Sequence, residues 1–301
     1  MSQHSLIEQL SAERAALVAA LTPRTVALAA RRRRAICAIR WRGPYLISAA
    51  EPLAGADRVD AGGEPGVVIA LDLTTDVAVI RTDSASPGEP PAGLAVREGL
   101  ALGETVAIVG ASPHGALLRW GTVCLAGSAW RSRRGGTITQ RLEFDTALDA
   151  RFEGALVADA AGRVAAMQVA GPFGRSLGIP AATIERVLNT VEQIGYLPRP
   201  YLGLRVQTLW LDAATVARLG RRAAQVAVVA GIDPGSPAER GGLEVGDLIE
   251  TIDGEEVEGV DAIARLLPDR APGSALELGL RRGGASDKRT LTVGERPRAA
   301  G

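Results

Sequence analysis

Histidine and cysteine, two side chains that commonly serve enzymes as base and nucleophile, are scarce in this sequence. The 301 residues include only two histidines, His4 and His114, and two cysteines, Cys37 and Cys124, which lie far apart. One disulfide could join the cysteines, but their spacing matches neither a disulfide framework nor a metal-binding motif. We therefore expect no metal site and no cofactor.

Short apolar runs separated by glycine and proline turns follow one another between residues 25 and 171. Many short strands at such spacing are typical of an all-β barrel or sandwich. We expect one helix at 4–21 before these strands and another at 180–194 after them. A proline-marked linker follows at 196–200. Ser5 and Glu8 would form a capping box at the start of the first helix.

The part of the chain after the linker resembles a PDZ domain of the bacterial HtrA type. The phrase PGSPAERGGLEVGDLIETIDGEEV follows the pattern Pro-Ala-x-x-x-Gly-Leu-x-x-Gly-Asp-x-Ile of that family. The phrase YLGL occupies the place of its carboxylate-binding loop, where successive backbone N–H groups hold a chain-terminal carboxylate. This resemblance implies a groove for protein C-termini or extended peptides, lined by Tyr201, Leu202, Gly203, Leu204, Val206, Ile263 and Leu267.

The strand-rich part then also resembles the HtrA family, whose members join a trypsin-like double β-barrel to a C-terminal PDZ domain. The phrases TTDVAVIRT, LALGETVAIVGASPHG and GTVCLAG match family phrases in the family's order, and the first of them makes Asp76 the triad acid. The resemblance predicts a mainly β fold with five segments: N-terminal helix 1–24, double β-barrel 25–195, linker 196–200, PDZ domain 201–296 and tail 297–301. In that layout the two cysteines lie on different barrels, so we expect free, buried thiols.

The resemblance breaks down at the residues that would carry proteolysis. The stretch YLISAAEPL has Glu51 where the family has the triad histidine, and the nucleophile segment FDTALDARFEGALVAD is one residue short. Phe152 or Glu153 then falls at the position of the serine. Because the triad mechanism needs a nucleophile and a base, we expect a pseudoprotease that is not an enzyme and cleaves no casein. The alternative is an active HtrA-like serine endopeptidase with a rearranged site.

A second expectation concerns the electrostatics of this position. In the family layout Glu51 lies next to Asp76, and two close carboxylates repel strongly in a protein. We expect Glu51 to turn outward, one carboxyl to stay protonated or a cation to intervene, and we favour pairing with Arg151 or a neighbouring arginine. Phe152 would then fill the space that faces the substrate in the family. His114 is expected to be an exposed loop residue rather than a relocated base.

Charge and hydropathy exclude several other classes of function. The formal net charge is zero and 47% of the residues are hydrophobic, which is typical of a folded globular protein. The run Arg31–Arg34 lacks interleaved aromatic residues, so we do not expect nucleic-acid binding. No apolar run is long enough for a membrane span, and the N-terminus does not resemble a signal peptide, so we expect a cytoplasmic protein. Homo-oligomerisation stays open.

Overall fold

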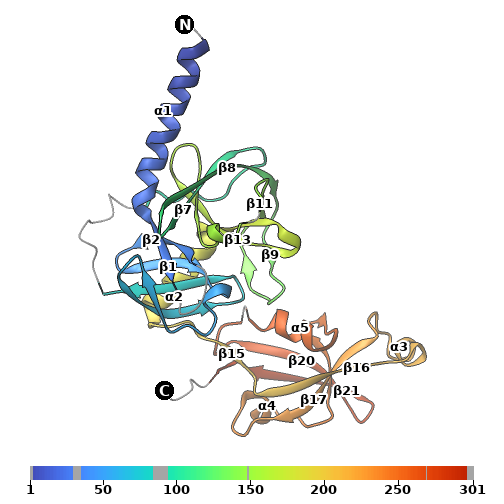
Figure 1. Cartoon of the computed structure of the whole chain (residues 1–301). Helices are drawn as coiled ribbons and strands as arrows, with labels where there is room; N and C mark the ends of the chain where they lie inside the picture. The colour runs from blue at the N-terminus through green and yellow to red at the C-terminus, as the bar shows by residue number, and fades with distance from the viewer. Residues whose placement is uncertain (1–2, 30–34, 84–93, 148, 269, 297–301) are drawn as a thin grey trace. The chain divides into compact units, whose positions relative to one another are not determined.

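The computed structural model describes residues 3–29, 35–83, 94–147, 149–268 and 270–296. They form two compact units, one of Met1–Trp130 with Thr137–Leu197 and one of Arg131–Gly136 with Pro198–Gly301. Figure 1 shows the two closed barrels of the first unit and the helix-covered sheet of the second. The expected fold class, a trypsin-like double β-barrel followed by a PDZ domain, is confirmed. The Arg31–Arg34 run and the predicted tail 297–301 lie outside the described residues.

The first barrel closes in the order β1-β2-β3-β6-β5-β4. Its strands are β1 Thr25–Ala29, β2 Ile36–Arg42, β3 Tyr45–Ala49, β4 Arg58–Ala61, β5 Pro65–Asp72 and β6 Val77–Thr82. Strand β3 carries the apolar stretch that precedes Glu51, and β6 begins directly after Asp76. Because β3 and β6 pair with Ala49 opposite Val77, these two acidic residues leave neighbouring strands at the same end of the barrel.

The second barrel closes in the order β11-β14-β13-β12-β7-β8. Its strands are β7 Thr105–Ser112, β8 Gly115–Ala126, β11 Leu142–Phe144, β12 Leu156–Ala158, β13 Val164–Ala170 and β14 Ser176–Pro180. A short hairpin of β9 Trp130–Arg131 and β10 Thr137–Ile138 lies between β8 and β11. The nucleophile segment spans the connection from β11 to β12 and contains a short 3-10 turn, η3, at Ala150–Phe152.

Helix α2, Ala181–Ile194, fixes the C-terminal end of the second barrel against the first. Its apolar face is buried at Ile184, Leu188 and Val191, within a core cluster that contains residues of both barrels. Arg42 of the first barrel reaches across to pair with Glu185 and with Glu192 of α2 at 2.6 and 2.7 Å. The two barrels and α2 therefore form one packed body, as a site built between barrels requires.

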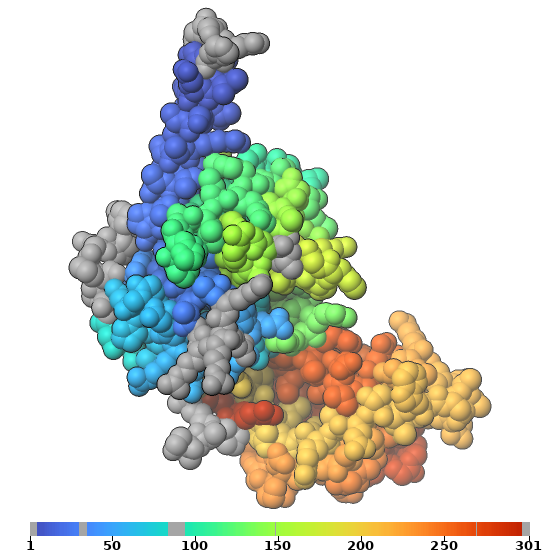
Figure 2. All heavy atoms as spheres, in the orientation of Figure 1, coloured from blue at the N-terminus to red at the C-terminus, as the bar shows by residue number. Residues whose placement is uncertain are grey.

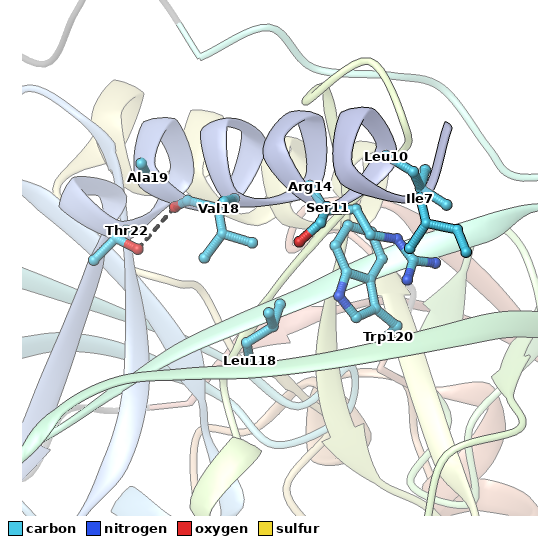
Figure 3. A pocket seen from close by; sticks show the side chains of 10 residues that line it. Ile7, Leu10, Ser11, Arg14, Val18, Ala19, Thr22, Leu118 and Trp120 are labelled. Carbon is cyan, nitrogen blue, oxygen red and sulfur yellow. Dashed lines mark hydrogen bonds between the residues drawn. The ribbon is translucent and has the colours of Figure 1, made fainter. Parts of the chain in front are cut away.

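Helix α1, Gln3–Leu21, lies along β8, and its first turns stand clear of the barrels (Figure 2). The helix already includes Gln3, so Ser5 is not its N-cap and the predicted capping box is wrong. Figure 3 shows the open groove that separates α1 from Leu118 and Trp120 of β8. The Arg14 guanidinium crosses this groove and lies 4.5 Å from the centre of the Trp120 ring. The helix thus packs on its own barrel unit, mainly through its C-terminal half.

The second unit is built on a sheet with the order β16-β17-β18-β20-β21, to which β19 adds at β18. The strands are β16 Leu204–Trp210, β17 Gln225–Ile232, β18 Leu248–Ile252, β19 Glu255–Glu256, β20 Ala275–Arg282 and β21 Ala285–Thr292. The helices are α3 Ala213–Leu219, α4 Pro237–Arg240 and α5 Gly259–Leu266, and β15 Pro200–Tyr201 pairs with β22 Gly294–Glu295. Strand β16 stands at an edge, so one row of its backbone groups has no strand partner in the described sheet.

Candidate functional site

Glu51 and Asp76 are neighbours, and a hydrogen bond from the Glu51 backbone to the Asp76 side chain joins them. Glu51 opens a 3-10 turn after β3 and is exposed. Its backbone N–H, rather than its side chain, donates to Asp76 Oδ1 at 2.7 Å. Asp76 holds this position with a left-handed backbone (φ 60), which is uncommon for a residue other than glycine. Of the three expected ways to relieve the repulsion between the two acids, the outward turn of Glu51 is the one that requires an exposed side chain, and Glu51 is exposed.

Arg151 does not supply the expected cation at these two acids. Its guanidinium pairs with Asp149 at 2.7 Å, and the Asp149 side chain also accepts from the Arg151 backbone N–H at 3.0 Å. Hydrogen bonding to Arg151 lowers the pKa of Asp149 to about 2. The part of the prediction that names Arg151 as the partner of Glu51 or Asp76 is therefore wrong. Asp149 caps the η3 turn and lies only two residues from Arg151. The guanidinium therefore pairs with Asp149 and not with an acid on another strand.

The structure separates the two residues that the sequence places at the nucleophile position. Phe152 is 3% exposed and packs in the core of the second barrel, with the Arg119 guanidinium 4.6 Å from its ring centre. Glu153 is also buried, and its carboxylate accepts from the Ala170 backbone N–H at 3.0 Å. Burial, with the negative charges of Asp76 and Glu51, raises the pKa of Glu153 to about 7. The pKa of Glu153 therefore depends on the negative charges of the other two acids.

The backbone around Glu153 is bonded within its own turn and to the first barrel. The N–H groups of Phe152 and Glu153 donate to the carbonyls of Asp149 and Ala150. The carbonyl of Glu153 accepts from the N–H of Cys37 on β2 at 2.7 Å. Gly154 follows with φ +80, and a Cβ there would lie 2.1 Å from the Cys37 carbonyl oxygen. A close approach of backbone to backbone, possible only with glycine, thus ties the nucleophile segment to β2.

Cys37 is buried behind this turn and is a poor nucleophile. Its thiol lies 3.1 Å from the Arg151 carbonyl oxygen, and burial raises the pKa of the thiol to about 11. A thiol with a raised pKa is almost never ionised at neutral pH. Both cysteines are free, but Cys124 is exposed, which contradicts the expectation that both are buried. Among the described residues no group of three or more histidines, cysteines and acids could hold a metal ion.

The second candidate site is the turn at the start of β16. Gly203 has φ +75, and a Cβ there would lie 2.1 Å from Ser236 Cβ, so only glycine fits. The carbonyls of Leu202 and Gly203 accept from the N–H groups of Ala238 and Asp233 at 2.9 and 2.8 Å. The described part of the chain offers no backbone acceptor to the N–H groups of Leu202 and Gly203. The turn thus directs its carbonyls inward and leaves its N–H groups for another acceptor.

The predicted groove residues lie on β15, on the turn, on β16, on α5 and at the C-cap of α5. Leu204, Val206 and Leu267 are half-buried at the margin of the core of the PDZ unit. Leu202 and Ile263, at 4% and 9% exposure, form the floor beneath them. Tyr201 donates its hydroxyl to Asp233 at 2.6 Å, beside the turn. Sequence reasoning missed the roles of Asp233 and Ser236, because neither is one of the fixed positions of the family pattern.

Two closed barrels followed by a sheet that begins with the glycine turn at Gly203 define a trypsin-like peptidase domain joined to a PDZ domain. Residues 39–167 match the family of trypsin-like peptidase domains, and residues 228–282 match a family of PDZ domains. The chain therefore has an HtrA/DegP-like arrangement of a trypsin-like serine protease domain and a PDZ domain.

Similar proteins have names of proteases. A probable periplasmic serine endoprotease DegP-like from Halomonas elongata is 28% identical over 264 residues, which cover 84% of this chain and 54% of that protein. The putative serine protease HhoA from Synechocystis is 28% identical over 244 residues, covering 76% of this chain and 60% of that one. This chain spans about half the length of the curated relatives it matches.

Solved structures agree with the fold. The HtrA-type protease AlgW with tripeptide has a TM-score of 0.63 at 25% identity, covering 94% of this chain and 97% of that one. The serine endoprotease from Yersinia pestis has a TM-score of 0.64 at 19% identity, covering 93% and 97%.

These comparisons correct two expectations. The expectation that the chain is not an enzyme is contradicted, because its relatives are named serine endoproteases and its structural neighbours are HtrA-type proteases. The expectation of a cytoplasmic protein is also contradicted, because several relatives are named periplasmic. Both expectations came from single local features, namely the residue types at two triad positions and the composition of the first segment. No described helix has the length and apolar composition that crossing a membrane requires.

Proposed function

We propose that this chain captures protein C-termini, or extended peptide segments, through its PDZ domain. The observation that carries the proposal is the turn Leu202–Leu204, whose carbonyls bond inward while its N–H groups open onto an edge strand. N–H groups around a left-handed glycine make a nest for a carboxylate, and a peptide can extend the sheet through main-chain hydrogen bonds. The structures of AlgW with a tripeptide and with a decapeptide support this use of the fold. An adaptor, chaperone-like or assembly role is one consequence of such capture.

The groove favours a peptide with an apolar last residue. Leu204 and Leu267 are half-buried on either side of it, above the buried side chain of Ile263. A short strand must lose conformational freedom when it binds, so we expect micromolar affinity, about −8 kcal/mol.

Placing a charge in the groove wall should abolish this recognition. Leu267→Glu is expected to weaken binding of a fluorescent peptide ending in leucine at least about tenfold, because a carboxylate would be desolvated beside the apolar side chain. Arg265→Glu adds the same side chain to the exposed opposite face of the same helix and should change affinity less than about twofold. Fluorescence anisotropy measures both. Equal losses in the two variants would contradict the groove assignment.

We also propose a second function, endopeptidase activity at a rearranged site centred on Glu153. It is favoured by the names of the relatives and by a buried carboxyl with a pKa of about 7 beside two further acids. Because the chain has neither serine nor cysteine between residues 145 and 157, water is the available nucleophile. The names of the relatives also lead us to propose that both functions operate in the periplasm.

The hydrolytic step balances with a single carboxyl group. The ionised Glu153 takes a proton from water as the water oxygen bonds to the peptide carbonyl carbon. The protonated carboxyl then gives that proton to the leaving nitrogen as the C–N bond breaks. The N–H groups of Phe152 and Glu153 already donate within their turn and cannot stabilise the oxyanion. We therefore expect turnover well below that of a serine endoprotease.

Casein turnover distinguishes this second function from simple capture. We expect slow cleavage that resists a serine-reactive fluorophosphonate and falls at least about a hundredfold in Glu153→Gln, because the general base is lost. Glu8→Gln, a surface change on α1, is the control and should leave the rate unchanged. Turnover that persists in Glu153→Gln, or covalent labelling by the fluorophosphonate, would contradict the role of Glu153.

A further inference from the structure

The free edge of the PDZ sheet continues past the groove into an exposed aromatic residue. Side chains alternate along β16, so Leu204, Val206, Thr208 and Trp210 share one face. The first two are half-buried against the core, whereas Trp210 is 70% exposed. By contrast Trp41 is 2% exposed. An exposed tryptophan on the same face as the groove is a large contact surface in line with a bound strand.

The start of α5 lies beside this end of the strand. The N–H of Val260 donates to Thr208 Oγ1 at 3.1 Å, which anchors the first turn of the helix on β16. A Cβ on Gly259 would lie 3.2 Å from the Gln225 side-chain oxygen, and Gln225 pairs with Trp210 across the ladder. Trp210 and the first turn of α5 therefore flank the same stretch of the edge.

The exposed charge at the start of α5 is negative. Glu258 and Asp261 are exposed at the start of the helix, and no described arginine or lysine pairs with either of them. Glu256 is already paired with Arg221 at 3.2 Å. The exposed Arg222 lies on the loop before β17 and is an opposing charge, as is the exposed Arg218 of α3. An exposed tryptophan face and exposed carboxylates at the same end of the strand are both groups that attract a cation.

We propose that Trp210, Glu258 and Asp261 form a second contact for the captured chain and select a lysine or arginine upstream of its C-terminus. The inference rests on the proposed capture of a C-terminal peptide by β16. A peptide that adds antiparallel with its last residue opposite Leu204 places the residue six positions earlier opposite Trp210, since Trp210 is six residues beyond Leu204. The basic side chain would lie on the indole face, close to the two carboxylates.

Three decapeptides with the same apolar C-terminal four residues test the inference on the full chain. They carry lysine, alanine or glutamate six positions before the end, and a tetrapeptide of the shared end is the reference. We expect the lysine peptide to bind about threefold to tenfold more tightly than the alanine peptide, and the glutamate peptide to bind most weakly. The lysine preference should shrink at high salt.

Variants locate the preference on the proposed residues. Trp210→Ala and the double variant Glu258→Gln, Asp261→Asn should each reduce the lysine preference while leaving the affinity of the tetrapeptide unchanged, because all three side chains are exposed and the folded groove is kept. Binding of the tetrapeptide together with equal affinities for all three decapeptides would overturn this inference alone. Failure of every peptide to bind would overturn the inference and the proposed capture together.

Discussion

Glu153→Gln is expected to stabilise the barrel unit by about 3 kcal/mol at pH 8 and to have little effect at pH 4. Burial raises the pKa of Glu153 to about 7 from an ordinary value of 4.5. Between these values the folded chain binds a proton that the unfolded chain releases. The contribution of Glu153 to stability is therefore complete below pH 4.5, falls as the pH rises toward 7, and stays lost above it.

The glutamine variant keeps the geometry and removes the titration. Its side-chain carbonyl can still accept from the Ala170 N–H, as the carboxylate does at 3.0 Å. Urea unfolding followed by tryptophan fluorescence at several pH values measures the difference, since Trp41 is 2% exposed in this unit. Glu8→Gln serves as an exposed control with no effect expected. Parallel pH profiles for the wild type and Glu153→Gln would contradict the burial of an acid at this position.

Gly154→Ala should be among the most damaging single substitutions in the barrel unit, at about 4 kcal/mol. The left-handed backbone costs an alanine about 1 to 2 kcal/mol, and the new Cβ would lie 2.1 Å from the Cys37 carbonyl oxygen. Neither segment can shift easily, because the hydrogen bond from the Cys37 N–H to the Glu153 carbonyl holds the two backbones together.

Gly55→Ala provides a matched control for this cost. Gly55 has φ +79, within a degree of the value at Gly154, but nothing lies within 4 Å of its Cβ position. It should therefore show only the conformational cost of about 1 to 2 kcal/mol. The difference between the two variants in urea unfolding isolates the clash with β2. Equal destabilisation would mean that the nucleophile segment is not held against Cys37.

The sequence was sufficient to predict those elements that are determined by a recurring pattern of residue types. Short apolar runs between glycine and proline turns identify the barrel strands, and the phrase YLGL places Gly203 in the turn that only glycine can form. The sequence was insufficient where a shift of the alignment by one residue changes which side chain enters the core. Phe152 and Glu153 are adjacent and both buried. Phe152 ends the 3-10 turn and packs in the core, whereas the Glu153 carboxylate accepts from Ala170 and is affected by the charge of Asp76.

Side-chain partners across short distances were also beyond the sequence. Arg151 was assigned to Glu51 or Asp76 because the family layout brings the loop near those acids, but Asp149 is only two residues away and caps the same turn. Similarly, Thr208 anchors the start of α5 from a strand more than fifty residues earlier. Such contacts depend on the residue at which each turn, strand or helix begins and ends, and the pattern of apolar and polar residues does not determine these boundaries.

The acid and amide forms of one peptide test the central claim most directly. The claim is that the N–H groups at Leu202–Leu204 receive a chain-terminal carboxylate. A peptide ending in leucine should bind the full chain with micromolar affinity, and its C-terminal amide should bind at least about tenfold more weakly, because the amide lacks the charge that the nest recognises. Equal affinities for the two forms would contradict the assignment of this turn.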